Sequence, residues 1–203
     1  MFIEPECKYP TVPMVELCSK IGSGATPKGG KSAYCDEGIS LIRSTNVFDY
    51  NFAYTDLAHI SDEQANALSN VVVEQKDVLF NITGVSVARC CIVPDDVLPA
   101  RVNQHVMILR PYKGKLMSYF IMATLCYTEN KAKLLGIGQS GSTREAINKQ
   151  EMESFQIIVP PDNMIEDFGT KAEQLYNMIC SNIQEIKHLE SMQQLILMQL
   201  SSR

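Results

Sequence analysis

Residues 168–200 have the sequence FGTKAEQLYNMICSNIQEIKHLESMQQLILMQL, and this stretch decides how the chain is organised. From Phe168 onward, apolar residues recur in steps that alternate between four and three, which places them on one stripe of a helix. The stripe consists of Phe168, Ala172, Leu175, Ile179, Asn182, Ile186, Leu189, Gln193, Ile196 and Leu200. No glycine or proline interrupts residues 170–203, so the sequence predicts one long helix over about 163–202.

The predicted helix is too long to be covered by one small domain. At 1.5 Å per residue, residues 165–200 span roughly 54 Å. A lone amphipathic helix is marginal in water, so its stripe needs a partner. The pattern favours a coiled coil with a second chain, and the alternative is a terminal helix that folds back on its own domain. We therefore expect a homodimer whose contacts are made by Phe168, Leu175, Ile179, Ile186, Leu189, Ile196 and Leu200.

The chain changes character at Pro160 and Pro161, and short β-rich runs alternate with turn signals before them. An apolar pattern of helical spacing also covers about 115–135. The sequence thus predicts an α+β fold, with a compact β-rich domain over 1–160 and a long helix over 161–203. The runs that we expect to form strands are 71–73, 78–83, 86–93, 102–109 and 155–159.

The composition is that of a globular protein, with 45% hydrophobic and 20% charged residues, so a folded domain is expected. The apolar runs are far shorter than the about 18 residues that a membrane-spanning helix needs. An acidic residue at position 4 and the lack of an apolar core argue against a secretory signal. We expect a cytoplasmic protein. Its seven cysteines lack the spacing of a zinc site, so no metal is expected.

One motif points toward catalysis and does not fit its required context. Gly136-Ile-Gly138-Gln-Ser-Gly141 matches the glycine pattern of dinucleotide-binding loops, but it follows a predicted helix where that fold needs a strand. A mobile glycine loop is the other interpretation. His59, His105 and His188 are scattered and match neither a metal site nor a catalytic nucleophile pattern. We expect no catalytic residues and no cofactor in this chain.

Several segments resemble target-recognition domains of type I restriction–modification specificity subunits. The opening of that domain is similar to Ile21-Gly-Ser-Gly-Ala-Thr-Pro27, then Tyr34, then Gly38-Ile-Ser-Leu-Ile-Arg43. Its middle and closing motifs are similar to residues 79–84, 101–111, 141–147 and 157–161, in the same order. Cys35 and Leu41 depart from the family, which has tryptophan there. A complete subunit has two recognition domains and two spacer helices, so this chain looks like a half subunit.

The resemblance implies sequence-specific recognition of double-stranded DNA without catalysis. It also implies partner subunits: modification subunits that methylate, and a restriction–translocase subunit that cleaves. We expect contacts from polar and basic residues on turns, because a rigid scaffold presents base readers there. The expected DNA contacts are Arg43, Ser44, Thr45, Asn46, Thr83, Ser86, Arg89, Ser142, Thr143 and Arg144.

The net charge of −5 does not suit a protein that grips DNA alone. Either positive charge is concentrated on one face, or partner subunits supply much of the grip. The charge favours the alternative function, a non-DNA binding module that dimerises through its C-terminal coiled coil.

Overall fold

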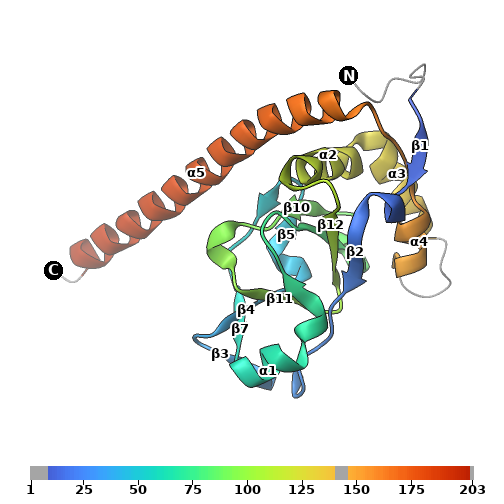
Figure 1. Ribbon diagram of the computed structural model, residues 1–203. Coiled ribbons are helices and arrows are strands. Elements are labelled where there is room, and N and C mark those ends of the chain that lie inside the picture. The colour runs from blue at the N-terminus through green and yellow to red at the C-terminus, as the bar shows by residue number, and fades with distance from the viewer. Residues whose placement is uncertain (1–8, 140–145, 202–203) are drawn as a thin grey trace.

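A computed structural model describes residues 9–139 and 146–201, and it has the α+β fold that the sequence predicts (Figure 1). The four-stranded sheet has the order β10-β9-β12-β2. Its strands are β2 (Cys18–Ser23), β9 (Val78–Asn81), β10 (Cys90–Ile92) and β12 (Val106–Pro111). The five-stranded sheet has the order β3-β7-β4-β11-β8. Its strands are β3 (Tyr34–Cys35), β4 (Ile39–Ile42), β7 (Ala58–Ile60), β8 (Val72–Val73) and β11 (Ala100–Val102).

The described residues also form two short strand pairs, five α-helices and several short 3₁₀ helices. The pairs are β1 (Thr11–Pro13) with β13 (Gln156–Ile158), and β5 (Val47–Phe48) with β6 (Asn51–Phe52). The helices are α1 (Asp62–Ala67), α2 (Lys115–Cys126), α3 (Thr128–Gln139), α4 (Lys149–Ser154) and α5 (Asp162–Ser201). Among them, no helix is both long enough and apolar enough to cross a membrane.

The four-stranded sheet separates two hydrophobic cores. On β9, Phe80 belongs to the core shared with α2, whereas Leu79 belongs to the core shared with the five-stranded sheet. On β12, Met107 belongs to the core shared with α2, and Ile108 belongs to the core shared with the five-stranded sheet. Successive side chains of a strand point to opposite faces, so both faces of this sheet are buried. This explains why the two central strands, β9 and β12, contain unbroken apolar runs in the sequence.

Four of the predicted strands are found in shortened form, while the strand predicted over 102–109 is divided by a turn between β11 and β12, and β12 continues to Pro111. The predicted helix over 115–135 is wrong in one respect. It is divided at Tyr127, whose backbone is extended with φ −61° and ψ 135°, into α2 and α3. The Asn130 side-chain amide donates a 2.9 Å hydrogen bond to the Thr124 carbonyl oxygen. Carbonyl groups in the last turn of a helix lack helical partners, and this bond satisfies one of them.

Gly136 and Gly138 lie inside α3, so the prediction of a mobile loop at these two residues is wrong. Gly138 is buried, and a Cβ atom there would be in ordinary van der Waals contact with side-chain atoms of Val87 and Ile147, at 3.6 Å. Because these residues sit within a helix, the strand–turn–helix context of a dinucleotide-binding loop is not met. Residues 140–145, including Gly141, lie outside the described residues.

The long helix predicted over 163–202 is confirmed as α5, whose 40 residues are about 60 Å long. Its first half packs on the rest of the chain. Ile165 and Tyr176 are buried, and the Tyr176 hydroxyl donates a 2.8 Å hydrogen bond to the Ile92 carbonyl oxygen. The Phe168 ring meets the Phe120 ring edge to face, with centroids 6.4 Å apart. This half of the helix therefore follows the fold-back alternative.

The second half of α5 projects beyond the two sheets (Figure 1). Contacts with the rest of the chain extend at least to Lys187, whose ammonium lies 4.8 Å from the centroid of the Tyr54 ring. All residues over 188–201 are exposed. The large apolar side chains of this end are Leu189, Met192, Leu195, Ile196, Leu197, Met198 and Leu200. The coiled-coil prediction therefore concerns mainly this end.

Gly169 is expected to be required for docking α5. A Cβ atom there would lie 2.7 Å from both the Cβ and the carbonyl oxygen of Leu116. Gly169→Ala should lower the free energy of unfolding by about 1–3 kcal/mol, the usual cost of overpacking. Gly136→Ala is the matched control because it is also helical and its Cβ would meet nothing within 4 Å. Gly136→Ala should raise the free energy of unfolding by about 1 kcal/mol, because alanine has a higher helix propensity than glycine. Urea unfolding of both variants checks this, and shifts of the same sign would contradict it.

Candidate nucleic-acid interface

Three turn segments that are distant in sequence meet around a polar pocket of about 350 Å³. Lys31 and Arg43 bring positive charge, and no carboxylate occurs among the described residues that line the pocket. In a chain of net charge −5, this surface is therefore locally positive. The lining residues are Thr26, Pro27, Gly30, Lys31, Tyr34, Arg43, Ser44, Thr45, Asn103, Gln104 and His105.

The segment after β4 forms a 3₁₀ turn, η3 (Ser44–Asn46), that is held from within by Asn46. Asn46 is fully buried. Its amide nitrogen donates to the carbonyl oxygens of Ala53 at 2.9 Å and Thr55 at 3.2 Å, and its amide oxygen accepts from the Arg43 backbone N–H at 3.0 Å. Asn46 thus shapes the loop, and its side chain is not presented to a ligand as the sequence interpretation expected.

Arg43 lies over an aromatic ring at the pocket wall. Its guanidinium carbon is 5.6 Å from the centroid of the Tyr34 ring, and its terminal nitrogen donates to the Asp56 carbonyl oxygen. Its Nε atom is buried and has no hydrogen-bond partner among the described residues. These contacts limit the rotamers that Arg43 can adopt, so its charge is held at the pocket.

Asn81, the last residue of β9, ties a second turn to η3. Its fully buried side-chain amide donates to the carbonyl oxygens of Ser44 at 2.9 Å and Val47 at 3.2 Å. Directly after Asn81 comes the turn that contains η5 (Gly84–Ser86). The sequence motif over 79–84 contains Asn81, but its role as the link between the two turns was missed, because the partners lie 34 and 37 residues away.

A chain of side-chain hydrogen bonds connects the turn between β11 and β12 to Thr26, in the segment after β2, and to the turn that contains η5. Thr26 Oγ1 donates to Gln104 Oε1 at 2.5 Å, and Gln104 Nε2 lies 3.1 Å from His105 Nε2. His105 Nδ1 lies 2.6 Å from Thr83 Oγ1. An amide nitrogen can only donate, so His105 Nε2 accepts and its Nδ1–H donates to the Thr83 hydroxyl oxygen. His105, predicted to be a strand residue, is therefore a bridging residue in a turn.

The neighbouring residues Asn103 and Gln104 have different roles. Asn103 is buried, and its side-chain oxygen accepts a 3.0 Å hydrogen bond from the His105 backbone N–H, which stabilises the turn. Gln104 is exposed and lines the pocket. The sequence analysis did not select Thr26, Lys31, Gln104 and His105 as site residues. The available signal was the resemblance, since Thr26, Gln104 and His105 lie within its segments.

The structure brings together part of the predicted contact set. Arg43, Ser44 and Thr45 line the pocket, and Thr83 is bonded to its wall through His105. Arg89 belongs to the turn after β9, and its guanidinium carbon lies 4.7 Å from the centroid of the Phe48 ring. Ser86 is the last residue of η5 and is half-buried. The remaining residues of the set, Ser142, Thr143 and Arg144, lie outside the described residues.

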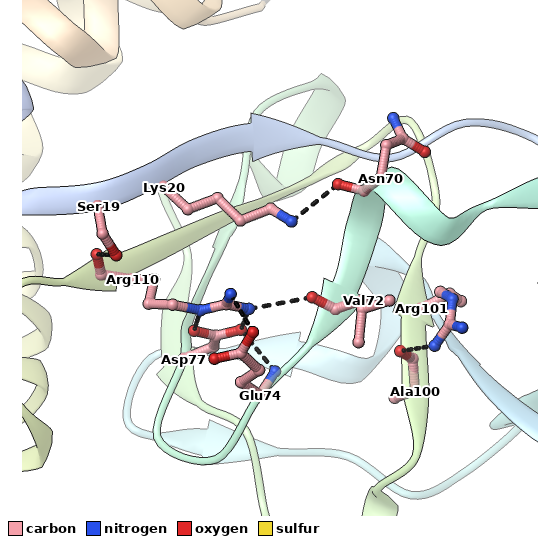
Figure 2. Close-up of polar contacts among 9 residues, drawn as sticks. All are labelled: Ser19, Lys20, Asn70, Val72, Glu74, Asp77, Ala100, Arg101 and Arg110. Atoms are coloured by element: carbon pink, nitrogen blue, oxygen red, sulfur yellow. Dashed lines mark hydrogen bonds and ion pairs between the residues drawn. The ribbon is translucent and has the colours of Figure 1, made fainter.

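A second group of cations, Lys20, Arg101 and Arg110, lies between the two sheets (Figure 2). Lys20 Nζ donates to the Asn70 carbonyl oxygen at 2.8 Å, and Arg101 Nε donates to the Ala65 carbonyl oxygen at 3.0 Å. Burial, followed by the nearby Arg110, lowers the pKa of Lys20 below its ordinary value. These two cations are thus held by backbone carbonyl groups.

Arg110 differs from its neighbours because it pairs with carboxylates. It donates to Asp77 through Nε at 2.8 Å and through a terminal nitrogen at 2.7 Å, and it also contacts Glu74 (Figure 2). The hydrogen bonds with Asp77 raise the pKa of Arg110. Arg110 also donates to the Val72 carbonyl oxygen of β8 at 3.0 Å, so it joins the four-stranded sheet to the five-stranded sheet. We interpret this group as structural.

Together, these features define a recognition module: rigid turns that present polar and basic side chains, followed by a long helix with an apolar free end. Residues 10–190 match the family described as "Type I restriction modification DNA specificity domain". The chain belongs to this family.

Solved structures share the fold. One match is a chain in a structure described as showing the complex assembly and conformational transition of the type I R-M system. Its TM-score is 0.62 at 19% sequence identity, and the match covers 93% of this chain and 44% of that chain. For the HsdS subunit from Thermoanaerobacter tengcongensis, the TM-score is 0.58 at 17% identity, covering 88% and 40%. For the S subunit from M. genitalium, the TM-score is 0.59 at 12% identity, and the match covers 87% of this chain and 41% of that chain. This chain therefore spans less than half the length of these proteins.

Proposed function

We propose that this chain recognises a double-stranded DNA sequence within a type I restriction–modification complex and catalyses no reaction itself. The observation that carries the proposal is the pocket at which three segments, those of Lys31, Arg43 and Gln104, gather positive and hydrogen-bonding side chains. Asn46, Asn81 and His105 hold the turns at and beside this pocket in place. Arginine and glutamine can hydrogen-bond base edges in a bidentate manner, while serine, threonine and lysine mostly contact phosphates. Membership of the specificity-domain family supports the same function.

Several residues of the pocket and of the neighbouring turn have a proposed role in contacting DNA. Arg43 and Gln104 are the proposed base readers, because both residues line the pocket and belong to types that read base edges. Phosphate contacts are proposed for Lys31, Ser44, Thr45, Thr83, Ser86 and Arg89. Asn46 is assigned to the loop scaffold. Ser142, Thr143 and Arg144 remain proposed contacts on the basis of the sequence alone.

The proposed division of the chain is a recognition domain over 1–160 and a helix over 161–203. We propose that modification subunits supply S-adenosylmethionine and methyl transfer, and that a restriction–translocase subunit supplies ATP-dependent cleavage. These partners can also clamp the DNA, which accounts for the net charge of −5 in a DNA-recognition protein.

A second copy of the chain is the proposed partner of α5. Residues 195–198, Leu-Ile-Leu-Met, are apolar and exposed around the full circumference of the helix. A helix that is apolar on all sides is normally buried. One neighbouring helix would cover only one side of this end, so the end requires a larger apolar surface around it. An apolar groove of about 600 Å³ between α2 and the docked half of α5, with Tyr127 and Leu175 in its lining, can receive it from the second copy. A two-fold axis would then repeat the contact.

DNA binding should depend on the modification subunits and on Arg43. The isolated chain should bind duplex DNA weakly, because its net charge leaves little for counterion release. In the complex, Arg43→Ala should weaken binding to the target by about 1–3 kcal/mol if it contacts a base. Lys113→Ala is the control, since Lys113 is exposed, pairs with Asp162 and lines neither the pocket nor the apolar groove. Fluorescence anisotropy titration measures both. Tight, salt-insensitive binding by the chain alone, or full affinity in Arg43→Ala, would contradict the proposed interface.

A further inference from the structure

Val85 is an apolar side chain presented almost completely to solvent. It is 98% exposed, whereas Tyr112 is 66% exposed and Val15 is 45% exposed in the same domain. It lies at the tip of η5, between the small residues Gly84 and Ser86. A Cβ atom at Gly84 would meet nothing within 4 Å, so the space beside the valine is open. A turn position favours glycine, asparagine, aspartate or serine, so the fold does not account for a β-branched apolar residue here.

The turn that carries Val85 is rigid at its base. Gly84 has φ +68° and Ala88 has φ +63°, and these two left-handed residues fold the chain tightly on itself. The Val87 N–H donates to the Gly84 carbonyl oxygen at 2.9 Å, and the Ala88 N–H donates to the Asn81 carbonyl oxygen at 2.9 Å. The hydrogen-bonded backbone of the turn therefore keeps the Val85 side chain in solvent.

The tip belongs to the same surface as the polar pocket. Asn81 fastens the start of the turn to Ser44, and Thr83 is bonded to His105 in the pocket wall. Arg89, at the other end of the turn, carries positive charge next to Phe48. An apolar tip is thus surrounded by groups suited to a polyanion, which favours DNA over an apolar protein surface as the occupant.

We propose that Val85 is a specificity-determining residue that contacts the 5-methyl group of a thymine in the major groove. The inference rests on the proposed DNA-recognition function and adds an apolar reader to it. The major-groove edge of thymine is the one that presents a methyl group, and apolar side chains pack against it. Hydrogen bonds from the polar residues of the pocket do not detect this methyl group, whereas an apolar contact from a valine does.

The test uses the full chain assembled with modification subunits and two randomised duplex libraries, one made with thymidine and one with deoxyuridine in its place. Wild type, Val85→Ala and Val15→Ala are each used to select bound sequences. Val15→Ala makes the same chemical change at an exposed valine next to Met14, whose N–H donates to the Phe155 carbonyl oxygen on another part of the domain. Val85→Ala removes no buried packing and Val15→Ala removes only part of one half-covered side chain. Thermal melting confirms that both variants are folded.

Wild type and Val15→Ala should enrich one motif in which a thymine is preferred over uracil by about fourfold, the equivalent of one buried methyl group. Val85→Ala should enrich the rest of that motif and lose the thymine preference at that position. If Val85→Ala discriminates thymine from uracil as well as wild type does, the inference is overturned while the proposed function stands. If wild type enriches no motif in either library, the proposed function fails, and this inference fails with it.

Discussion

Replacing Arg110 by methionine should lower the free energy of unfolding by about 3–5 kcal/mol, because it leaves a buried carboxylate without its partner. Asp77 is 1% exposed, and Arg110 makes two hydrogen bonds to it. Burial raises the pKa of Asp77, while those bonds and one from the Glu74 backbone N–H act in the opposite direction. Methionine keeps the aliphatic stem of Arg110, so the loss of the charge dominates the effect.

Urea unfolding measures this effect against two controls. Lys113→Ala removes an ion pair with Asp162 in which both side chains are more than half exposed, so it should cost at most about 1 kcal/mol. Adding Asp77→Asn to Arg110→Met should recover part of the loss, because the buried charge is removed and an oxygen remains for the Glu74 N–H. An Arg110→Met protein as stable as wild type would contradict the structural role of this pair.

Leu189→Asp combined with Ile196→Asp should convert a dimer into a monomer. The two side chains are 55% and 54% exposed in the single chain, so the variant should fold normally. Each side chain that becomes fully covered contributes about 1.5–3 kcal/mol to association. An unpaired aspartate in its place adds a desolvation cost that can exceed this gain.

Sedimentation equilibrium separates the two states, because wild type should give about twice the chain mass of 22.7 kDa and the variant 22.7 kDa. Ser191→Asp is the control, since it adds a negative charge at an exposed polar position of the same helix end. Leu175→Asp, in the groove, should weaken the dimer as well. A wild-type chain that sediments at 22.7 kDa would remove the homodimer from the proposal.

The long helix was predictable because its signal is local. Steps of four and three residues, with no glycine or proline after position 169, are sufficient to specify α5. The docking of its first half was not predictable, because it depends on Gly169 meeting Leu116 and on Tyr176 reaching the Ile92 carbonyl, 84 residues away. The break at Tyr127 also depends on one side-chain bond that periodicity does not reveal.

The candidate site was predictable in its segments and not in its contacts. The resemblance and the rule that readers lie on turns selected the segments of Arg43 and Thr83, which do meet. Asn46 was selected because it is polar and follows a strand, yet its amide is used by carbonyl groups seven and nine residues further on. Gln104 enters the pocket through a bond to Thr26, 78 residues away, which no local pattern indicates.

Methylation mapping tests most directly whether this chain determines DNA sequence specificity. Three strains are compared in a host that lacks other specificity chains. The first expresses the modification subunits alone, the second adds this chain, and the third adds its Arg43→Ala variant. All methylated positions in the three genomes are then sequenced. One split motif with inverted symmetry should appear only when the chain is present, because two copies related by a two-fold axis contact inverted half-sites. Arg43→Ala should relax the motif at one position of each half. The same methylation with and without the chain would contradict its role in DNA recognition.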